Sequence, residues 1–403
     1  MGTTPEAASA AAQVLRGNYG RFLLRALQVV FWVLVLCPWH ALFIYPLLMY
    51  LVSKVYRKKF VRQPITPKVS QLIAAYNEEK AIAGKLENSL ALDYPVDKLE
   101  IIVVSDASTD RTDEIVRSFA DRGVKLVRVE GNVGKSAALN EGVTRATGEI
   151  LAFSDATGHW SPESIRAMAE HYADPRVGCV SGWVAYRYDN SLTAQGFGVY
   201  QRFVMALRRA EASFGSGFNA PGSIHSIRKA VFRPLPQATF GDMVDPLHTA
   251  LRGLRTTHED RAISWEESRT QIGDEWRARL RICMRAWTFM FYALRRFPVF
   301  KAPMYCFQLA SHKFLRWLVG PFMIPIFVLN AALLRQHPVY KVLFAAQVAY
   351  YGATLLGLVL ARAGFRVRGL SGLVFYNSVN LAYMVALVRC LRGERVARWR
   401  PSR

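Results

Sequence analysis

Four long apolar runs constrain the fold of this chain more than any other feature of its sequence. The first extends from Leu27 to Val55 and is almost uncharged until Lys54. The other three come late in the chain, at about Phe314–Leu334, Val339–Ala361 and Gly369–Val388. Each has roughly 20 residues or more, which is the length that a helix needs to cross a hydrocarbon core about 30 Å thick. The sequence therefore predicts one transmembrane helix before a globular part and about three after it.

Composition divides the chain into six parts. The expected order is a mobile N-terminal tail, a first transmembrane helix, a globular domain, an amphipathic interfacial segment, the later transmembrane helices and a basic tail. Their predicted ranges are 1–20, 21–56, 68–273, 274–312, 313–388 and 389–403.

The charge distribution indicates a membrane partner. The formal net charge is +22, and most of the excess lies after Trp276, where Glu394 is the single acidic residue. Basic residues beside membrane spans suit anionic lipid surfaces and cytoplasmic loop ends. We therefore expect contact with the lipid bilayer and none with nucleic acid, because no nucleic-acid recognition motif accompanies the charge.

The basic cluster after the first run predicts the side of the membrane. By the positive-inside rule, this cluster places the following domain in the cytoplasm, and we expect a multi-pass protein of the inner membrane. The five cysteines have neither metal-site nor disulfide spacing, which agrees with a reducing compartment. The cluster consists of Lys54, Arg57, Lys58, Lys59 and Arg62.

The globular part alternates strands with helices. This pattern predicts a mostly parallel, doubly wound α/β sheet. The predicted strands are Val69–Ala75, Leu99–Ser105, Val124–Val129 and Glu149–Ser154, and the predicted helices between them are Glu78–Leu92, Asp110–Ala120 and Lys135–Ala146.

Polar residues follow the ends of these strands, where an open α/β sheet binds its ligands. Tyr76 to Glu78 follow the first strand, Asp106 follows the second, and Asp155 follows the fourth. The pair Gly134-Lys135 and the later acid Asp242 add groups that suit a phosphorylated ligand. Together they predict a nucleotide-sugar site.

Four motifs resemble one enzyme family. They are Ala74-Ala-Tyr-Asn-Glu-Glu79, Val103-Val-Ser-Asp-Ala-Ser-Thr-Asp110, Gly131-Asn-Val-Gly-Lys-Ser-Ala-Ala-Leu-Asn140 and Phe153-Ser-Asp-Ala-Thr157. In order and spacing they are similar to the inverting family-2 glycosyltransferases of GT-A fold, and in particular to the membrane-embedded, cellulose-synthase-like members. The resemblance covers about residues 68–290.

The resemblance implies roles for the donor site. Asp106 would hold a uracil ring, Lys135 would lie beside the nucleotide, and Ala75, Tyr76 and Glu78 would line the nucleoside pocket. Asp155 would bind Mg²⁺ or Mn²⁺, although Thr157 replaces the second acid of the usual Asp-x-Asp pair. One carboxylate is enough when the diphosphate supplies further oxygens. The alternative is that Asp155 only caps the next helix.

The resemblance also implies a catalytic base. The family uses the second acid of an acidic pair at the start of a helix, and here Gly241-Asp242 opens a helix that should end near Arg252. Asp242 is therefore the predicted base, with Asp245 as the competitor.

The acceptor site is less well defined. Trp265 and Glu266, after a short predicted strand, should line an acceptor groove. Processive members carry Gln-x-x-Arg-Trp near an amphipathic helix that we expect at 274–296, and this chain lacks that string. Arg281, Arg285 and Trp287 could take its place in contacting diphosphate and acceptor. A basic helix facing lipid is the alternative, and processivity stays open.

The expected reaction is inverting transfer from a nucleoside diphosphate sugar, UDP-linked, to a glycan or lipid-linked acceptor. A non-catalytic relative is one alternative. A transporter is another, but Asn330, Gln347, Asn377 and Asn380 are few polar groups for a pathway and none is ionisable.

The predicted topology contains a conflict. Four full spans place the C-terminal tail outside the cell, whereas its arginines, from Arg389 to Arg403, favour the cytoplasm. We prefer four spans with an external tail. The alternative is that Val339–Ala361 or Gly369–Val388, whose glycines tolerate bending, enters and leaves on one side.

Overall fold

The structure is a computed structural model of the whole chain. It describes residues 5–56, 60–187, 203–213, 216–239, 241–267, 275–297, 299–365 and 367–396. The chain forms two compact units. The first consists of Met1–Tyr45 with Ser311–Val385, and the second of Pro46–Ala310 with Ala386–Arg403.

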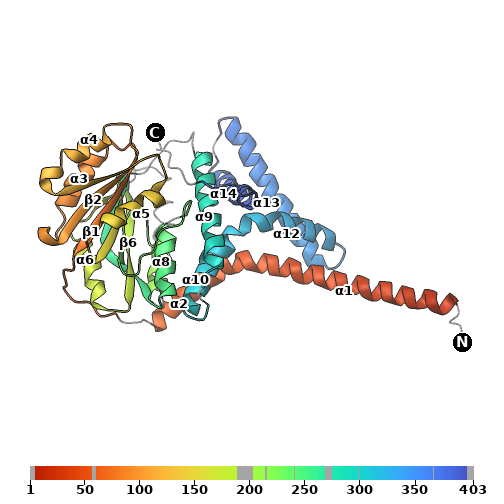
Figure 1. Cartoon of the computed structure of the whole chain (residues 1–403). Coiled ribbons are helices and arrows are strands. Elements are labelled where there is room, and N and C mark those ends of the chain that lie inside the picture. Colours follow the sequence, from red (N-terminus) through yellow and green to blue (C-terminus); the bar gives the residue numbers. More distant parts are fainter. Residues whose placement is uncertain are drawn as a thin grey trace. The chain divides into compact units, whose positions relative to one another are not determined.

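An eight-stranded sheet forms the centre of the second unit (Figure 1). Its order is β3-β2-β1-β4-β7-β6-β8-β5, with β3, β2, β1 and β4 parallel and β7 antiparallel to its neighbours β4 and β6. The predicted mostly parallel α/β sheet is therefore confirmed. The strands are β1 Val69–Ala75, β2 Leu99–Asp106, β3 Val124–Val129, β4 Ile150–Asp155, β5 His159–Trp160, β6 Val177–Arg187, β7 His225–Arg228 and β8 Arg255–Glu267.

Helices cover both faces of the sheet. Consecutive β1 residues point to opposite faces of the sheet and show which helices cover each face. On one face, Ile73 belongs to an apolar core with residues of α3 and α4; on the other, Leu72 faces Gly142 of α5. The α8 helix shares the α5 face, because its Asp245 bonds His225, whose ring stacks on Phe153 beside Leu72. The helices are α3 Ile82–Leu90, α4 Thr112–Arg117, α5 Lys135–Arg145, α6 Ser164–Glu170 and α8 Gly241–Leu251.

Two predicted helices are shorter than expected, for local reasons. The helix predicted from Glu78 begins at Ile82, because Asn77 has a φ of 54° and a turn precedes the helix. The helix predicted from Asp110 begins at Thr112, because the Asp110 carboxylate accepts the Thr112 N–H at 3.0 Å and holds residues 110–112 in a turn before the helix. Residues 203–213 form a further helical segment.

The β8 strand is longer than predicted. Trp265 and Glu266 do not follow a short strand; they lie within β8, opposite Ala185 and Tyr186 of β6. The pairing is irregular between Ser181 and Trp183, where β8 carries extra residues. Pairing with β6 on one side and β5 on the other extends the strand beyond what local sequence indicated.

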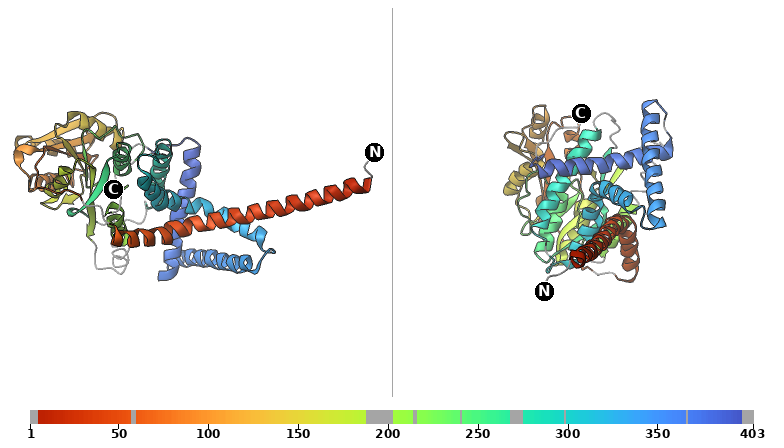
Figure 2. Two further views of the ribbon diagram at one scale, coloured as in Figure 1. Left: turned by 90° about the horizontal axis from the view of Figure 1, so that it is seen from below. Right: turned by 90° about the vertical axis from the view of Figure 1, so that its right-hand side faces the viewer.

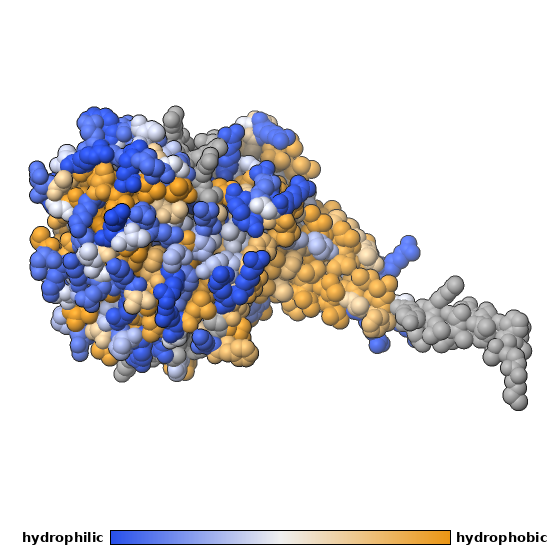
Figure 3. Space-filling model, viewed as in Figure 1, coloured by the Kyte–Doolittle hydropathy of each residue, from blue (hydrophilic) through white to orange (hydrophobic). Residues whose placement is uncertain are grey.

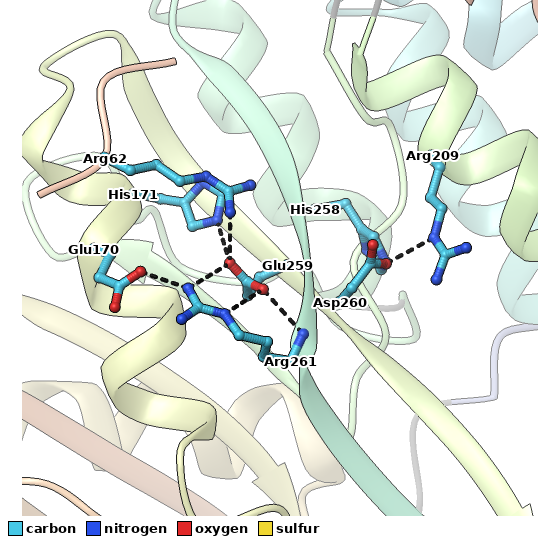
Figure 4. A network of polar contacts seen from close by, with 8 residues as sticks. All are labelled: Arg62, Glu170, His171, Arg209, His258, Glu259, Asp260 and Arg261. Carbon is cyan, nitrogen blue, oxygen red and sulfur yellow. Dashed lines mark hydrogen bonds and ion pairs between the residues drawn. The ribbon is translucent and has the colours of Figure 1, made fainter. Parts of the chain in front are cut away.

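Among the extra residues of β8, buried Glu259 is the centre of an ionic network (Figure 4). Glu259 accepts hydrogen bonds from Arg62 at 3.1 Å, His171 at 2.9 Å and Arg261 at 3.1 Å. Burial opposes ionisation of Glu259, but the bonds from His171 and Arg261 prevail and hold its pKa below the usual range. Arg62 belongs to the linker after α2 (Tyr45–Val55), so the network fastens that linker to the sheet.

The first unit is helical, and apolar side chains cover much of its visible face (Figure 3). Its N-terminal helix α1, Pro5–Trp39, is the long red helix of Figure 2 and continues as a π-helical turn, His40–Ile44. Residues 5–20 are thus helical rather than an irregular tail. Phe31 of α1 packs on Leu333 and Tyr340.

Three described helices are long and apolar enough to cross a membrane: Gly20–Val55, Pro338–Arg362 and Gly369–Leu391. The predicted run Phe314–Leu334 is different. It is divided between Pro303–Trp317 and Val319–Leu333, which meet at 62°, so it is not one straight span. The re-entrant bend that the sequence allowed in Val339–Ala361 or Gly369–Val388 lies in neither. The last tail residues, 397–403, lie outside the described part.

Polar side chains inside these helices join one helix to another. The amides of Asn330 and Gln347 lie 2.9 Å apart, and Asn377 donates to Tyr350 at 2.8 Å and Thr354 at 3.0 Å. Asn380 instead donates within its own helix, to the Tyr376 carbonyl at 3.0 Å. Because these amides are bonded to neighbouring helices or to their own helix, they give no support to the transporter alternative.

Candidate active site

Asp106 ends β2 and is fully buried beneath the loop that leads to α5. Its two carboxylate oxygens accept the N–H groups of Val133 at 2.7 Å and Gly134 at 2.8 Å. Gly134 has a φ of 94°, a conformation that glycine adopts without strain. In this structure Asp106 therefore fixes the loop that presents Lys135.

Lys135 is the first residue of α5, and its ammonium forms an ion pair with Asp155 at the end of β4. Both side chains are partly exposed, at 24% and 32%. Gly222 lies beside this pair, since a Cβ there would be 3.7 Å from the Lys135 Nζ. The structure thus brings together the predicted lysine and the predicted metal ligand.

A second lysine, which sequence reasoning missed, is buried near Asp155. Lys85 of α3 is fully buried; its Nζ donates to the Gly158 carbonyl at 2.7 Å and lies 4.8 Å from the Trp160 ring centroid. Burial lowers the pKa of Lys85 to about 7, and the nearby Asp155 charge opposes the shift. Its position inside an otherwise amphipathic helix gave no signal in the sequence.

The turn after β1, at Tyr76 to Glu78, is held by the loop after β2. The Asn77 Oδ1 accepts the Thr109 N–H at 2.8 Å, and the Glu78 N–H donates to Thr112 Oγ1 at 2.8 Å. Tyr76 and Glu78 are partly exposed on this turn, whereas Ala75 is fully buried at the end of β1. The turn and Asp106 therefore lie at the same edge of the sheet, as their strand positions predicted.

The residues at Asp155 fit a divalent cation only if a substrate completes its shell. Within the described part of the chain, no three His, Cys, Asp or Glu side chains are placed to hold a metal ion. Asp155 is the available carboxylate, and Thr157 stands where a second acid is usual in the resembling family. Mg²⁺ commonly binds one or two carboxylates together with phosphate oxygens and water. A diphosphate would supply the missing oxygens.

The structure separates the two candidates for the base. Asp245 is fully buried in α8, and its Oδ2 lies 3.0 Å from His225 Nε2. Asp242, in the first turn of the same helix, is partly exposed. An acceptor hydroxyl could reach Asp242, whereas Asp245 is enclosed by protein.

Hydrogen bonds to backbone carbonyls connect the start of α8, at Asp242, to the residues around Lys135. The Asp242 carbonyl accepts the Ala220 N–H at 2.7 Å, two residues before Gly222. From the other side, Ser136 of α5 donates to the Thr239 carbonyl at 3.2 Å. The loop 218–223 and α5 therefore place Asp242 on the same side of the sheet as the Lys135–Asp155 pair.

The acceptor candidates differ in accessibility. Trp265 is 39% exposed, whereas Trp287 of α9 (Glu275–Leu294) is fully buried and stacks on Phe291. Trp287 is therefore not available as an acceptor platform. Arg281 and Arg285 lie on the same helix; burial and then the Arg281 charge lower the pKa of Arg285, while Asp242 opposes the shift. Arg285 thus lies within electrostatic reach of Asp242.

The α/β sheet thus carries acids at the ends of its parallel strands, a lysine at a helix start and a partly exposed acid on the same side, the arrangement that the resemblance to GT-A glycosyltransferases led us to expect. Residues 70–234 match the family described as Glycosyl transferase family 2. The chain therefore carries a glycosyl transferase family 2 domain, as the four motifs predicted.

Comparison with known proteins agrees. The chain is 27% identical over 220 residues to the poly-beta-1,6-N-acetyl-D-glucosamine synthase of Staphylococcus epidermidis, a match that covers 53% of each. It is 40% identical over 127 residues, 29% of each chain, to the probable glycosyltransferase YdaM of Bacillus subtilis. The chain thus spans about half the length, or less, of these curated relatives.

One solved structure has the same fold over most of the chain. It is the mannosyltransferase PcManGT from Pyrobaculum calidifontis in complex with GDP-Man and Mn²⁺. The TM-score is 0.68, with 24% identity, 92% of this chain and 100% of that chain covered. At this identity the likeness establishes the fold.

Proposed function

We propose that this protein is a membrane-bound inverting glycosyltransferase that transfers a sugar from a nucleoside diphosphate sugar to a glycan or lipid-linked acceptor. The observation that carries the proposal is the convergence of Lys135, Asp155 and Asp242 on one side of the sheet. The family 2 domain and the synthase named among its relatives support the same conclusion.

The donor would bind along the edge formed by β1, β2 and β4. Tyr76 and Glu78 would line the nucleoside pocket, and Asp106 would orient the base through the loop it holds and through a remaining carboxylate lone pair. Lys135 would leave Asp155 for the diphosphate, where its ammonium neutralises charge on the leaving group. We expect a UDP-linked donor from the sequence resemblance; GDP-Man, named with PcManGT, is the donor to test against it.

Asp242 would act as the general base. It must lie within hydrogen-bond reach of the acceptor hydroxyl, whose proton it would accept as the oxygen attacks the anomeric carbon. A single displacement from the face opposite the diphosphate inverts that carbon. Arg285, within electrostatic reach of Asp242, would help to retain the ionised carboxylate or contact the diphosphate.

Asp155 would hold Mg²⁺ or Mn²⁺ together with diphosphate oxygens. When bound, such a cation stabilises the negative charge that develops on the departing diphosphate. PcManGT is in complex with Mn²⁺, which supports a divalent ion in this fold.

Trp265, partly exposed at the end of β8, would form one wall of the acceptor site, with Glu266 beside it. The apolar helices would hold the enzyme in the cell membrane, with the basic residues after the first span placing the domain in the cytoplasm. A lipid-linked or membrane-extruded glycan acceptor follows from that location.

The test uses the full chain in detergent with Mg²⁺ or Mn²⁺ and a panel containing UDP-glucose, UDP-N-acetylglucosamine and GDP-mannose. Released nucleoside diphosphate is measured with and without glycan acceptors, and the anomeric configuration of the product is determined by NMR. Asp242→Asn should lower transfer by roughly 10² or more, because an amide cannot accept the proton, while UDP binding stays within about threefold. Retention of anomeric configuration, or full turnover by the variant, would overturn this mechanism.

A further inference from the structure

A buried histidine connects three elements of the active site. His225, in β7, is 2% exposed, and its ring stacks on Phe153 of β4 with 5.0 Å between centroids. Its Nδ1 lies 2.9 Å from the Pro221 carbonyl, and its Nε2 lies 3.0 Å from Asp245 Oδ2 of α8. One imidazole therefore contacts a strand, a loop and a helix.

Each of those three elements carries a group of the proposed site. Phe153 lies two residues before Asp155 on β4. Pro221 lies between Ala220, whose N–H holds the Asp242 carbonyl, and Gly222, which adjoins the Lys135 ammonium. Asp245 lies one helical turn after Asp242 on α8. The His225 ring thus contacts β4, which carries Asp155, the loop that adjoins Lys135, and α8, which carries Asp242.

The hydrogen bonds fix the number of protons that the pair holds. A carbonyl can only accept, so His225 Nδ1 must carry a proton and donate it to Pro221. In a neutral ring Nε2 then has none, and its 3.0 Å contact with Asp245 requires one further proton. His225 and Asp245 therefore share a proton: they are either imidazolium and carboxylate, or imidazole and carboxylic acid.

Such a hydrogen-bonded pair fixes the relative position of the two elements that it joins. Compared with apolar residues of similar volume, a buried polar pair adds little stability, but its hydrogen bond has one geometry, which apolar packing lacks. The Asp245 contact joins α8 to His225 of β7, whose ring stacks on β4, and Asp242 lies in the first turn of α8.

We propose that His225 and Asp245 are positioning residues that hold the base Asp242 at a fixed place relative to Asp155 and Lys135. This inference rests on the function proposed above. Neither residue touches the reacting atoms; the pair acts through α8, the loop 218–223 and β4. Loss of the pair should impair the chemical step more than donor binding.

The experiment compares four variants of the full-length enzyme. Asp245→Asn keeps the hydrogen bond to His225 without the shared proton, because the amide N–H can donate to a neutral Nε2. His225→Phe combined with Asp245→Ala keeps the stacking on Phe153 and nearly the same total volume but deletes both polar links. Asp242→Asn reports on the base. His171→Gln is the matched control, since His171 is a buried histidine bonded to Glu259 rather than to α8.

The measured quantities are kcat, donor KM, UDP affinity and the temperature of unfolding. We expect the double variant to lose roughly 10² in kcat, as small misplacements of catalytic groups do, with donor KM and UDP affinity within about threefold of wild type. Asp245→Asn should keep at least about one third of kcat. His171→Gln should lower the unfolding temperature without lowering kcat.

Two results would overturn the inference while leaving the proposed function intact. One is wild-type kcat in the double variant together with an inactive Asp242→Asn. The other is a loss in Asp245→Asn as deep as that in Asp242→Asn, which would make Asp245 the base. Full activity of Asp242→Asn would instead refute the proposed function. If the double variant does not fold, His225→Asn, which still offers a donor to Pro221, replaces it under the same kcat criterion.

Discussion

Lys85 provides a test of the electrostatics beside Asp155. Its ammonium is fully buried against the Gly158 carbonyl and the Trp160 ring, and burial lowers its pKa from 10.5 to about 7. A shift of that size corresponds to roughly 5 kcal/mol of penalty for the protonated form. Replacing Lys85 with Met removes the titrating group and keeps much of the side-chain length.

The sign follows from proton linkage. Below pH 7, Lys85 is protonated in the folded and the unfolded chain, so the folded state bears the whole penalty. Between pH 7 and 10.5 the unfolded chain binds a proton that the folded chain has released, so the free energy of unfolding of the wild type rises with pH. From pH 7.5 to 9 the rise is about 2 kcal/mol.

The assay is thermal unfolding of the wild type and Lys85→Met in detergent at pH 7.5, 8.25 and 9. The unfolding temperature of the variant minus that of the wild type should fall by roughly 4–8 °C over this range, since about 1 kcal/mol corresponds to 2–4 °C in a domain of this size. Lys80→Met, at an exposed lysine before the same helix, should show no such change. A difference that stays constant from pH 7.5 to 9 for Lys85→Met would refute the argument.

Three further predictions concern other parts of the domain. Asp106→Ala should raise donor KM at least about tenfold, because two buried N–H groups of the Lys135 loop lose their acceptor; an unchanged KM in initial-rate assays would contradict this. Trp265→Ala should weaken acceptor binding while UDP affinity, measured by calorimetry, is unaffected. Glu259→Gln should lower the unfolding temperature at pH 7, where the depressed carboxyl pKa stabilises the fold, and the difference from wild type should shrink as pH falls below 4.5; a constant difference would argue against the network.

Local sequence was a good guide to the parallel half of the sheet. Buried strands there are short apolar runs, and β1 and β3 have the predicted bounds, because apolar periodicity and turn residues act within a few positions. The same reasoning placed Asp106 and Asp155 at strand ends, and family motifs supplied their expected roles. The helix starts shifted where a turn precedes the helix, as at Asp110, whose carboxylate accepts the Thr112 N–H.

The remaining features depend on contacts between distant residues. Trp265 is part of β8 because β5 and β6 pair with it, and the pairing partners lie far away in sequence. The His225–Asp245 and Lys85–Gly158 hydrogen bonds join residues that are 20 and 73 positions apart, respectively. No local pattern in the sequence distinguishes such buried polar residues from polar residues at the surface. The break near Leu318 is an exception, because Gly320 and Pro321 follow it within three residues, and Pro321 has no N–H to donate to the Trp317 carbonyl.

The linker contacts determine where a fragment that contains only the α/β domain should begin. A fragment beginning at residue 68, the sequence-based boundary, would lack the Arg62 bond to Glu259 and the Val61 N–H bond to Asp174. Buried Glu259 would then lose the hydrogen bond from Arg62 and retain those from His171 and Arg261. Phe60, which packs on the core of the sheet, would be missing as well. A stable fragment should therefore begin at or before Phe60, where the polypeptide already belongs to the domain that follows it.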